Sequence, residues 1–211
     1  MNPLEIRNSK LGVQIVKALQ SRKMDAYFVE NKQDALNLAL SLIPKDHVVS
    51  WGGSATLKEI GLIDEVKKGF KVIDRDLGQS KEEKTQLMRQ ALLSDTFLTS
   101  ANALSVDGQI VNIDGTGNRI AATIFGPTSV IFVIGMNKVC KTVDDAWSRA
   151  RNTAAPANAQ RFEDLGTPCS FNGTCSDCKS DNCICAYMLT TRFSKPAHKI
   201  KVILVNETLG F

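Results

Sequence analysis

The most hydrophobic stretch of the sequence runs from Ser129 to Ile134 and reads SVIFVI. β-Branched and aromatic side chains favour a strand. A strand without polar alternation is typical of a parallel sheet that is covered on both faces. This stretch therefore predicts a central parallel strand and restricts the chain to folds that bury one.

Short strand-like segments alternate with amphipathic helical segments along the rest of the chain. Apolar residues recur at three- and four-residue spacing in most of the predicted helices, which cover residues 4–24, 32–43, 62–68, 81–93 and 142–154. The other predicted strands of the sheet cover residues 26–29, 47–51, 70–73, 96–99 and 199–205. This alternation indicates an α/β fold with a mainly parallel sheet.

The segment from Ser100 to Arg119 contains an antiparallel exception. Residues 103–106 and 109–113 are strand-like and flank Asp107-Gly108, a pair that favours the positive φ angles of a type I′ hairpin turn. The second strand ends in a polar loop whose two glycines free the backbone to approach a ligand closely. The alternative is a glycine-rich turn capped by Asp and Asn side chains. The ligand-binding candidates here are Ser100, Asn102, Asp114, Gly115, Thr116, Gly117, Asn118 and Arg119.

Two further candidates follow predicted strands. Gly52-Gly53-Ser54 leads into a helix that Ser54, or a capping box between Thr56 and Glu59, can start. Backbone N–H groups at a helix start suit a phosphate or carboxylate, although a tight strand-to-helix turn with close helix packing is an equal alternative.

Asn137 and Lys138 follow the strand that ends at Ile134. Lys138 is a compact, mobile charge that suits an anionic substrate. Since ligands of open α/β sheets bind beyond the carboxyl ends of the strands, we expect these segments and the 114–119 loop to converge. Asp114 is the candidate for acid–base catalysis, and the sequence reveals no nucleophile–base pair.

Five of the six cysteines form a cluster, Cys169-x5-Cys175-x2-Cys178-x4-Cys183-x-Cys185. In a reducing compartment such a cluster more often binds a metal or is redox-active than forms disulfides. The intervening Gly, Ser, Asp, Asn and Lys residues form no core, so thiolate ligation would supply the missing stability. Four thiolates suit either tetrahedral zinc or an iron–sulfur cluster. The spacing predicts a metal centre and leaves both its metal and its four ligands open.

The remaining properties restrict the partners. The sequence has no run of about 18 apolar residues, so we expect no transmembrane helix and no membrane partner. Its polar start lacks the apolar core of a signal peptide, which favours the cytoplasm. The net charge is +4 with scattered basic residues, and this argues against a nucleic-acid partner, because nucleic-acid binders concentrate their basic residues on one face.

The segments SWGGSATLKEIGL, SANALSVDGQIVNIDGTGNRIAATIFGP and VIGMNKV, followed by the cysteine-rich tail, resemble the lactate-utilisation (LUD) domain family of LutC-like and YkgG-like proteins. The resemblance extends from about Leu11 to Gly210, and NIDGTGNR and GMNK are its most specific parts. It implies a three-layer α/β/α fold of the NagB/RpiA/CoA-transferase-like type. It also implies one domain over residues 1–211, with the cysteine-rich loop, residues 166–188, inserted before the last strand.

The resemblance also implies functions. Members of the superfamily bind phosphosugars, CoA thioesters or folates, and LUD proteins are linked to lactate oxidation beside iron–sulfur partners. The leading expectation is therefore a small anionic metabolite in an α/β cleft, a Cys-ligated centre, and a role in lactate or other organic-acid oxidation. One alternative is a transferase or isomerase of phosphorylated or CoA-linked substrates, with structural zinc. The other is a non-catalytic assembly subunit of an iron–sulfur oxidoreductase.

Overall fold

The computed structural model describes residues 2–211 and has a large sheet of six parallel strands in this part of the chain. Their order is β1-β10-β7-β4-β2-β3. The strands are β1 (Asp25–Val29), β10 (Ile200–Val205), β7 (Ser129–Gly135), β4 (Thr96–Thr99), β2 (Val48–Trp51) and β3 (Lys71–Ile73). The predicted parallel sheet is confirmed, and β7 lies inside it with every residue buried.

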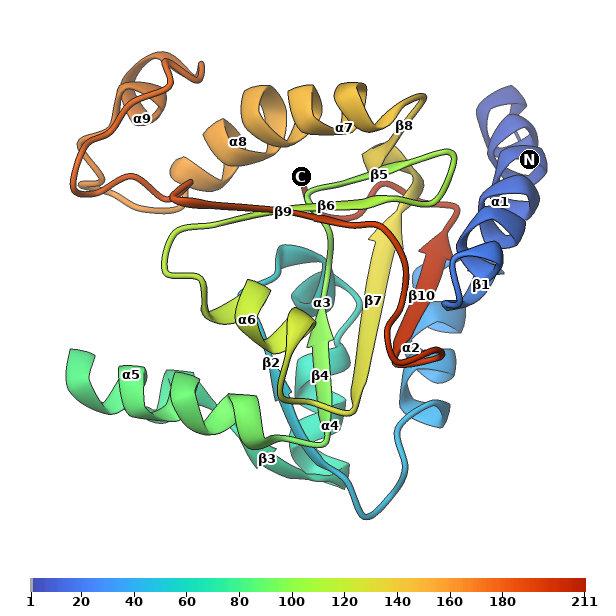
Figure 1. Ribbon diagram of the computed structural model, residues 1–211, viewed down its shortest axis with the longest axis horizontal. Helices are drawn as coiled ribbons and strands as arrows, with labels where there is room; N and C mark the ends of the chain where they lie inside the picture. Colours follow the sequence, from blue (N-terminus) through green and yellow to red (C-terminus); the bar gives the residue numbers. More distant parts are fainter. Residues whose placement is uncertain (1) are drawn as a thin grey trace.

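Helices pack on both faces of the large sheet (Figure 1). On one face Ile131 of β7 shares a hydrophobic cluster with Ala35 and Leu57. On the other face Phe132 shares a cluster with Leu19. The covering helices are α2 (Lys32–Ser41), α3 (Ala55–Glu59) and α4 (Leu62–Gly69) on the first face, and α1 (Pro3–Ser21) and α6 (Asn118–Ile124) on the second. The three-layer arrangement agrees with the prediction.

A second sheet lies on the α1 and α6 side. Its strands, in spatial order, are β8 (Val139–Cys140), β5 (Ala103–Ser105), β6 (Ile110–Asp114) and β9 (Tyr187–Thr191). Leu104 and Ile110 pack into the same cluster as Phe132, while Val111 faces Ala146 on the opposite side. Our sequence analysis missed β8 and β9, because β8 has only two residues and β9 follows the polar cysteine-rich segment.

The β5–β6 hairpin forms, but its turn is not type I′. Gly108 has a φ of 87°, whereas the described non-glycine residues with positive φ do not include Asp107. The Gly108 N–H donates to the Ser105 carbonyl at 2.9 Å, and the Asp107 carboxylate accepts from the Ser105 hydroxyl and from Arg22. Within the turn, only Gly108 has a left-handed backbone conformation, and the Asp107 side chain binds Ser105 and Arg22.

The remaining helices are short or peripheral. Two helices, α7 (Val143–Arg149) and α8 (Ala155–Ala159), precede the cysteine-rich segment along the chain. The π-helical turn η4 (Ala150–Ala154) joins them into one rod above the second sheet (Figure 1). No helix within residues 2–211 is long and apolar enough to cross a membrane. The elements not yet given are η1 (Arg75–Leu77), α5 (Lys81–Gln90), η2 (Ala91–Leu93), η3 (Met136–Lys138) and α9 (Pro168–Asn172).

Candidate functional site

A cleft opens where β2, β4 and β7 end, and it encloses a cavity of about 70 Å³. The expected convergence of strand ends therefore brings together residues that lie far apart in the sequence. Six of the ligand-binding candidates from the sequence line this cavity: Gly53, Ser54, Ser100, Asn102, Arg119 and Lys138.

Lys138 lies at the bottom of the cleft with 3% of its surface exposed. Its Nζ donates to Thr56 Oγ1 at 2.9 Å and to Ser100 Oγ at 3.1 Å. Burial lowers the pKa of Lys138 to about 7, and the positive charges of Arg149 and Arg119 act in the same direction. Lys138 therefore exchanges between ammonium and neutral amine near neutral pH.

Arg119 lines the cleft, but its guanidinium donates its hydrogen bonds to other groups of the protein. Its guanidinium donates to the Ser100 carbonyl and to Asn102 Oδ1, both at 3.1 Å, and also to a carbonyl of β6. Its stem packs against Gly52, where a Cβ atom would lie 2.6 Å from Arg119 Cδ. Arg119 thus positions Ser100 and Asn102, and Gly52 provides the room for it.

Asp114 closes the loop that follows β6. Its Oδ1 accepts from the N–H groups of Thr116 at 3.1 Å and Gly117 at 3.0 Å, and its Oδ2 lies 3.6 Å from Arg119 Nε. The carboxylate is thus engaged on both oxygens, and Asp114 is not among the described residues that line the cleft. Its acid–base role stays a prediction.

The other residues of this loop face the cysteine-rich segment. A Cβ on Gly115 would lie 3.0 Å from Ile184 Cα, and one on Gly117 would lie 3.2 Å from the Tyr187 ring. Asn118 begins α6. The 114–118 loop therefore packs against the cysteine-rich segment, and its role in ligand binding stays a prediction.

The start of α3 is capped by Ser54 alone. Its Oγ accepts from the Leu57 N–H at 3.2 Å. The alternative capping box between Thr56 and Glu59 does not form, because the Thr56 hydroxyl is bound to Lys138 and the Glu59 carboxylate accepts from the Gly210 N–H at 2.7 Å.

Asn137 anchors residues 209–210 beside the cleft. Its Nδ2 donates to the Gly210 carbonyl and its Oδ1 accepts from the Leu209 N–H, both at 3.2 Å. A Cβ on Gly210 would lie 2.7 Å from Thr56 Oγ1 and 3.2 Å from Lys138 Nζ. The approach of this segment to Lys138 therefore requires glycine at position 210.

Our sequence analysis missed two arginines of the site. Arg149, half-buried at the end of α7, donates to the Asn102 carbonyl at 2.5 Å. Arg161, exposed just beyond α8, lines the mouth of the cleft and donates to Asn158 Oδ1 at 3.2 Å. Neither belongs to a motif. Arg149 lies at the end of α7 and Arg161 just beyond α8, and both come to the cleft only through tertiary packing.

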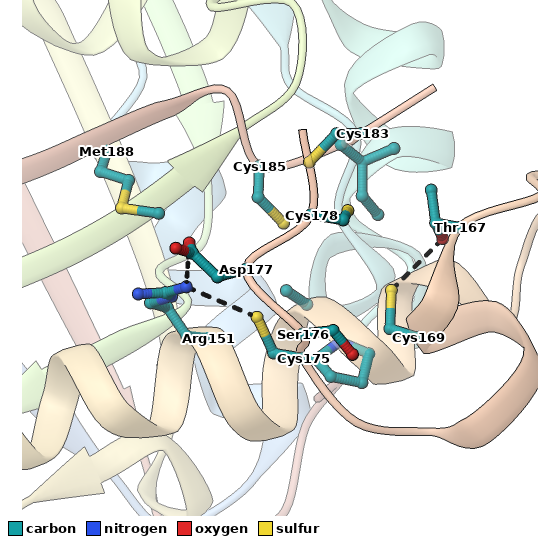
Figure 2. A pocket seen from close by; sticks show the side chains of 13 residues that line it. Arg151, Thr167, Cys169, Cys175, Ser176, Asp177, Cys178, Cys183, Cys185 and Met188 are labelled. Atoms are coloured by element: carbon teal, nitrogen blue, oxygen red, sulfur yellow. Dashed lines mark hydrogen bonds and ion pairs between the residues drawn. The ribbon is translucent and has the colours of Figure 1, made fainter. Parts of the chain in front are cut away.

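All five clustered cysteines surround a second cavity, of about 40 Å³, which Figure 2 shows. Arg151 of η4 faces it and donates to Asp177 Oδ1 at 2.6 Å and to Cys175 Sγ at 3.7 Å. Burial and, to a smaller extent, the charges of the Cys183, Cys169 and Cys175 thiolates together raise the pKa of Cys185 to about 12. The thiols therefore lie close enough to repel one another when ionised.

This donor set fits a cation, because a bound metal ion stabilises thiolates and removes their mutual repulsion. The thiols converge on the cavity without forming a coordination shell. As they are placed, residues 2–211 include no three His, Cys, Asp or Glu side chains close enough together to hold one metal ion.

The pattern of the family described as the LUD domain matches residues 13–205. No curated protein matches the chain.

Among solved structures, a DUF162 family protein from Deinococcus radiodurans is similar over 94% of this chain and 98% of its own, with 15% identity and a TM-score of 0.54. At this identity the likeness concerns the fold alone. The delta subunit of eIF2B from Chaetomium thermophilum is similar over 50% of this chain and 46% of its own, with 23% identity and a TM-score of 0.30. A tetrameric eIF2B-beta2-delta2 complex from C. thermophilum is similar over 92% of this chain and 61% of its own, with 17% identity and a TM-score of 0.35.

Proposed function

The chain belongs to the LUD domain family, and from this premise we propose that it binds a small organic anion in the cleft around Lys138 and a metal centre among its clustered thiols. The observation that carries the first part is an excess of buried positive charge. Lys138 has no carboxylate within ion-pair distance in the described chain, and Arg119 has only Asp114, at 3.6 Å. Because unpaired buried charge is costly, an anion would complete the site.

The size of the cleft favours a short acid. A cavity of about 70 Å³ admits only a few heavy atoms, so a 2-hydroxy or 2-oxo acid such as lactate or pyruvate is the proposed ligand. A carboxylate beside Lys138 would favour the ammonium form and raise the pKa of Lys138. Binding is therefore coupled to proton uptake.

Isothermal titration with lactate and pyruvate tests this part. We expect affinity to be highest below about pH 7, where Lys138 is protonated in the free protein, and to fall by up to about tenfold per pH unit above it. Lys138→Met removes the deep charge and should abolish measurable binding, while Lys141→Met, which removes an exposed charge nearby, should not alter it. Equal affinity in both variants would refute the anion site.

The metal part rests on the convergence of the five thiols on one cavity. Cys175, Cys178, Cys183 and Cys185 are the proposed ligands, with Cys169 able to replace one of them. Bound there, an iron–sulfur cluster would supply one-electron transfer for organic-acid oxidation, and iron–sulfur oxidoreductase subunits are then the proposed partners. Arg151 would balance part of the negative charge of the thiolates.

The identity of the bound metal can be tested on protein purified without oxygen. The measurements are metal and sulfide analysis and a visible spectrum. Iron with acid-labile sulfide supports the oxidation proposal. Zinc without colour makes the cysteine segment a structural clip and favours the transferase or isomerase alternative. The absence of both metals from protein with five reactive thiols would contradict the metal centre.

A further inference from the structure

The fold brings together two polar side chains of the cleft, Ser100 and Lys138, that the sequence does not indicate as a pair. Ser100 Oγ and Lys138 Nζ lie 3.1 Å apart although the residues are 38 positions apart, and this separation is within the range of an activated hydroxyl and its base. We propose that Ser100 is an acyl-accepting nucleophile and Lys138 its general base, so that the cleft carries an acyl-transfer activity on esters or thioesters of short organic acids.

The hydrogen bonds around Lys138 support these roles. The Thr56 hydroxyl donates its proton to the Leu209 carbonyl at 3.3 Å, so toward Lys138 it acts as an acceptor and holds one Nζ–H at 2.9 Å. The Ser100 hydroxyl has no other hydrogen-bond partner among residues 2–211. When Lys138 is neutral, the Ser100 proton can therefore point at the amine lone pair.

Ser100 is held rigidly in this position. It directly follows β4, and its carbonyl accepts from Arg119 and from Asn112 Nδ2, each at 3.1 Å. Only 5% of Ser100 is exposed. A nucleophile fixed by its backbone in this way needs little reorganisation before reaction.

Burial and two neighbouring arginines bring the pKa of Lys138 to about 7, where a general base works efficiently at neutral pH. In the first step the Ser100 oxygen bonds to the acyl carbon, and its proton passes to Lys138 Nζ. The bond to the leaving alcohol or thiol then breaks, and the Lys138 ammonium returns the proton to it. Water attacks the acyl-serine in a second step with the same base, releasing the acid and free Ser100.

The cavity selects a short acyl group, because it has room for only a few heavy atoms. The leaving group would pass Arg161 at the mouth, so an anionic alcohol or thiol is the favoured kind. This activity shares the cleft with the proposed anion site but does not depend on anion binding, because it rests on the geometry of the Ser100–Lys138 pair.

The test uses 4-nitrophenyl acetate, an uncharged ester, with the full chain. We expect a burst of nitrophenolate, one acetyl group per chain by intact mass, and the label on Ser100 by peptide mapping. Hydroxylamine should remove the label, because it cleaves an ester and leaves a lysine amide intact. The burst rate should increase with pH through about 7, as Lys138 loses its proton.

Ser100→Ala should abolish the burst, and Lys138→Met should slow it by about 100-fold or more. The matched controls are Ser41→Ala and Lys141→Met, both exposed and outside the cleft. A hydroxylamine-resistant label on Lys138, or no label on wild-type Ser100, would overturn the proposal even if a variant failed to fold. Loss of lactate and pyruvate binding with an intact burst would instead contradict only the anion site.

Discussion

At the scale of single residues, the burial of Lys138 carries a large electrostatic cost to the stability of the fold. It is buried without an ion-pair partner in the described chain, and its hydrogen bonds go to two neutral hydroxyls. The pKa of Lys138 is about 7 in the folded state against an ordinary 10.5. Between these two values the unfolded chain binds one more proton than the folded chain, so the contribution of Lys138 to stability rises with pH. Below about pH 7 its full cost is present, on the order of 5 kcal/mol.

We therefore predict that Lys138→Met stabilises the protein while abolishing the functions proposed for the cleft. At pH 6 urea unfolding should show a gain of about 1–3 kcal/mol, because the loss of two hydrogen bonds offsets part of the relieved desolvation. Because wild type regains about 5 kcal/mol between pH 7 and pH 10.5, the gain should disappear as the pH rises and become a net loss of about 2–4 kcal/mol above pH 10. A difference from wild type that does not vary with pH would contradict the buried, shifted lysine.

Substitution by lysine should destabilise the protein at one arginine of the cleft and leave its stability almost unchanged at another. Arg119→Lys removes the guanidinium hydrogen bonds to the Ser100 carbonyl, to Asn102 Oδ1 and to a carbonyl of β6, so it should cost about 2–4 kcal/mol in urea unfolding. Arg161→Lys, at an exposed position, should stay within about 0.5 kcal/mol of wild type. Equal stabilities would show that Arg119 does not position the site.

At the scale of elements, the α7–η4–α8 rod serves both cavities. It places Arg149 beside Asn102, Arg151 beside Cys175 and Asn158 at the mouth of the cleft. Single π-helical turns such as η4 are frequent at functional sites. Here the turn directly follows Arg149, which contacts Asn102 of the cleft, and it contains Arg151, which contacts Cys175.

The rod begins at a reciprocal cap, whose loss should be measurable. Thr142 Oγ1 accepts from the Asp145 N–H, and Asp145 Oδ2 accepts from the Thr142 N–H, both at 3.1 Å. Thr142→Ala and Asp145→Ala should each cost about 1 kcal/mol in thermal or urea unfolding. The double variant should cost less than the sum of the two, because each single change already breaks the shared cap. Strict additivity would contradict the reciprocal arrangement.

The contact between the 114–118 loop and the cysteine-rich segment gives a second prediction at this scale. A methyl group at Gly115 would lie 3.0–3.3 Å from backbone atoms of Ile184. Because these atoms belong to the backbone, no side-chain rotation can relieve the close contact. Gly115→Ala should therefore displace the segment that carries Cys183 and Cys185, and thiol-reagent kinetics should show these cysteines reacting several-fold faster. Gly69→Ala, where nothing lies within 4 Å of the added atom, is the control and should leave the rates unchanged.

At the scale of the whole molecule, the large sheet concentrates stability in its interior strands. Ile131 of β7 is completely buried, whereas Ile73 lies half-buried on the edge strand β3. Ile131→Ala should cost about 2–5 kcal/mol, and Ile73→Ala about half as much or less, in denaturant unfolding. Similar costs at both positions would contradict the position of β7 inside the sheet.

Local patterns in the sequence predicted the layers and most strands, because hydrophobic periodicity reports directly which faces of an element are buried. The SVIFVI run predicted β7 as a fully buried strand, and the glycines and polar residues after β2, β4 and β7 marked the edge where the cleft forms. The patterns failed where length or side-chain contacts decided the outcome. The two-residue β8 is too short for a period, and the Asp107 carboxylate in the hairpin turn is bound by Arg22, which lies 85 positions away.

The sequence alone determined the LUD domain family, the parallel α/β sheet and the existence of a cysteine cluster, because these depend on composition and on neighbours along the chain. Only the tertiary structure decided which contacts the candidate site residues make. It turned Arg119 and Asp114 inward as supports, moved the 114–118 loop against the cysteine-rich segment, and brought Arg149 and Arg161 to the cleft. It also joined Ser100 to Lys138 in a low-dielectric pocket. The direction of a side chain and the solvation of a charge depend on contacts between distant segments, and these contacts exist only after the chain has folded.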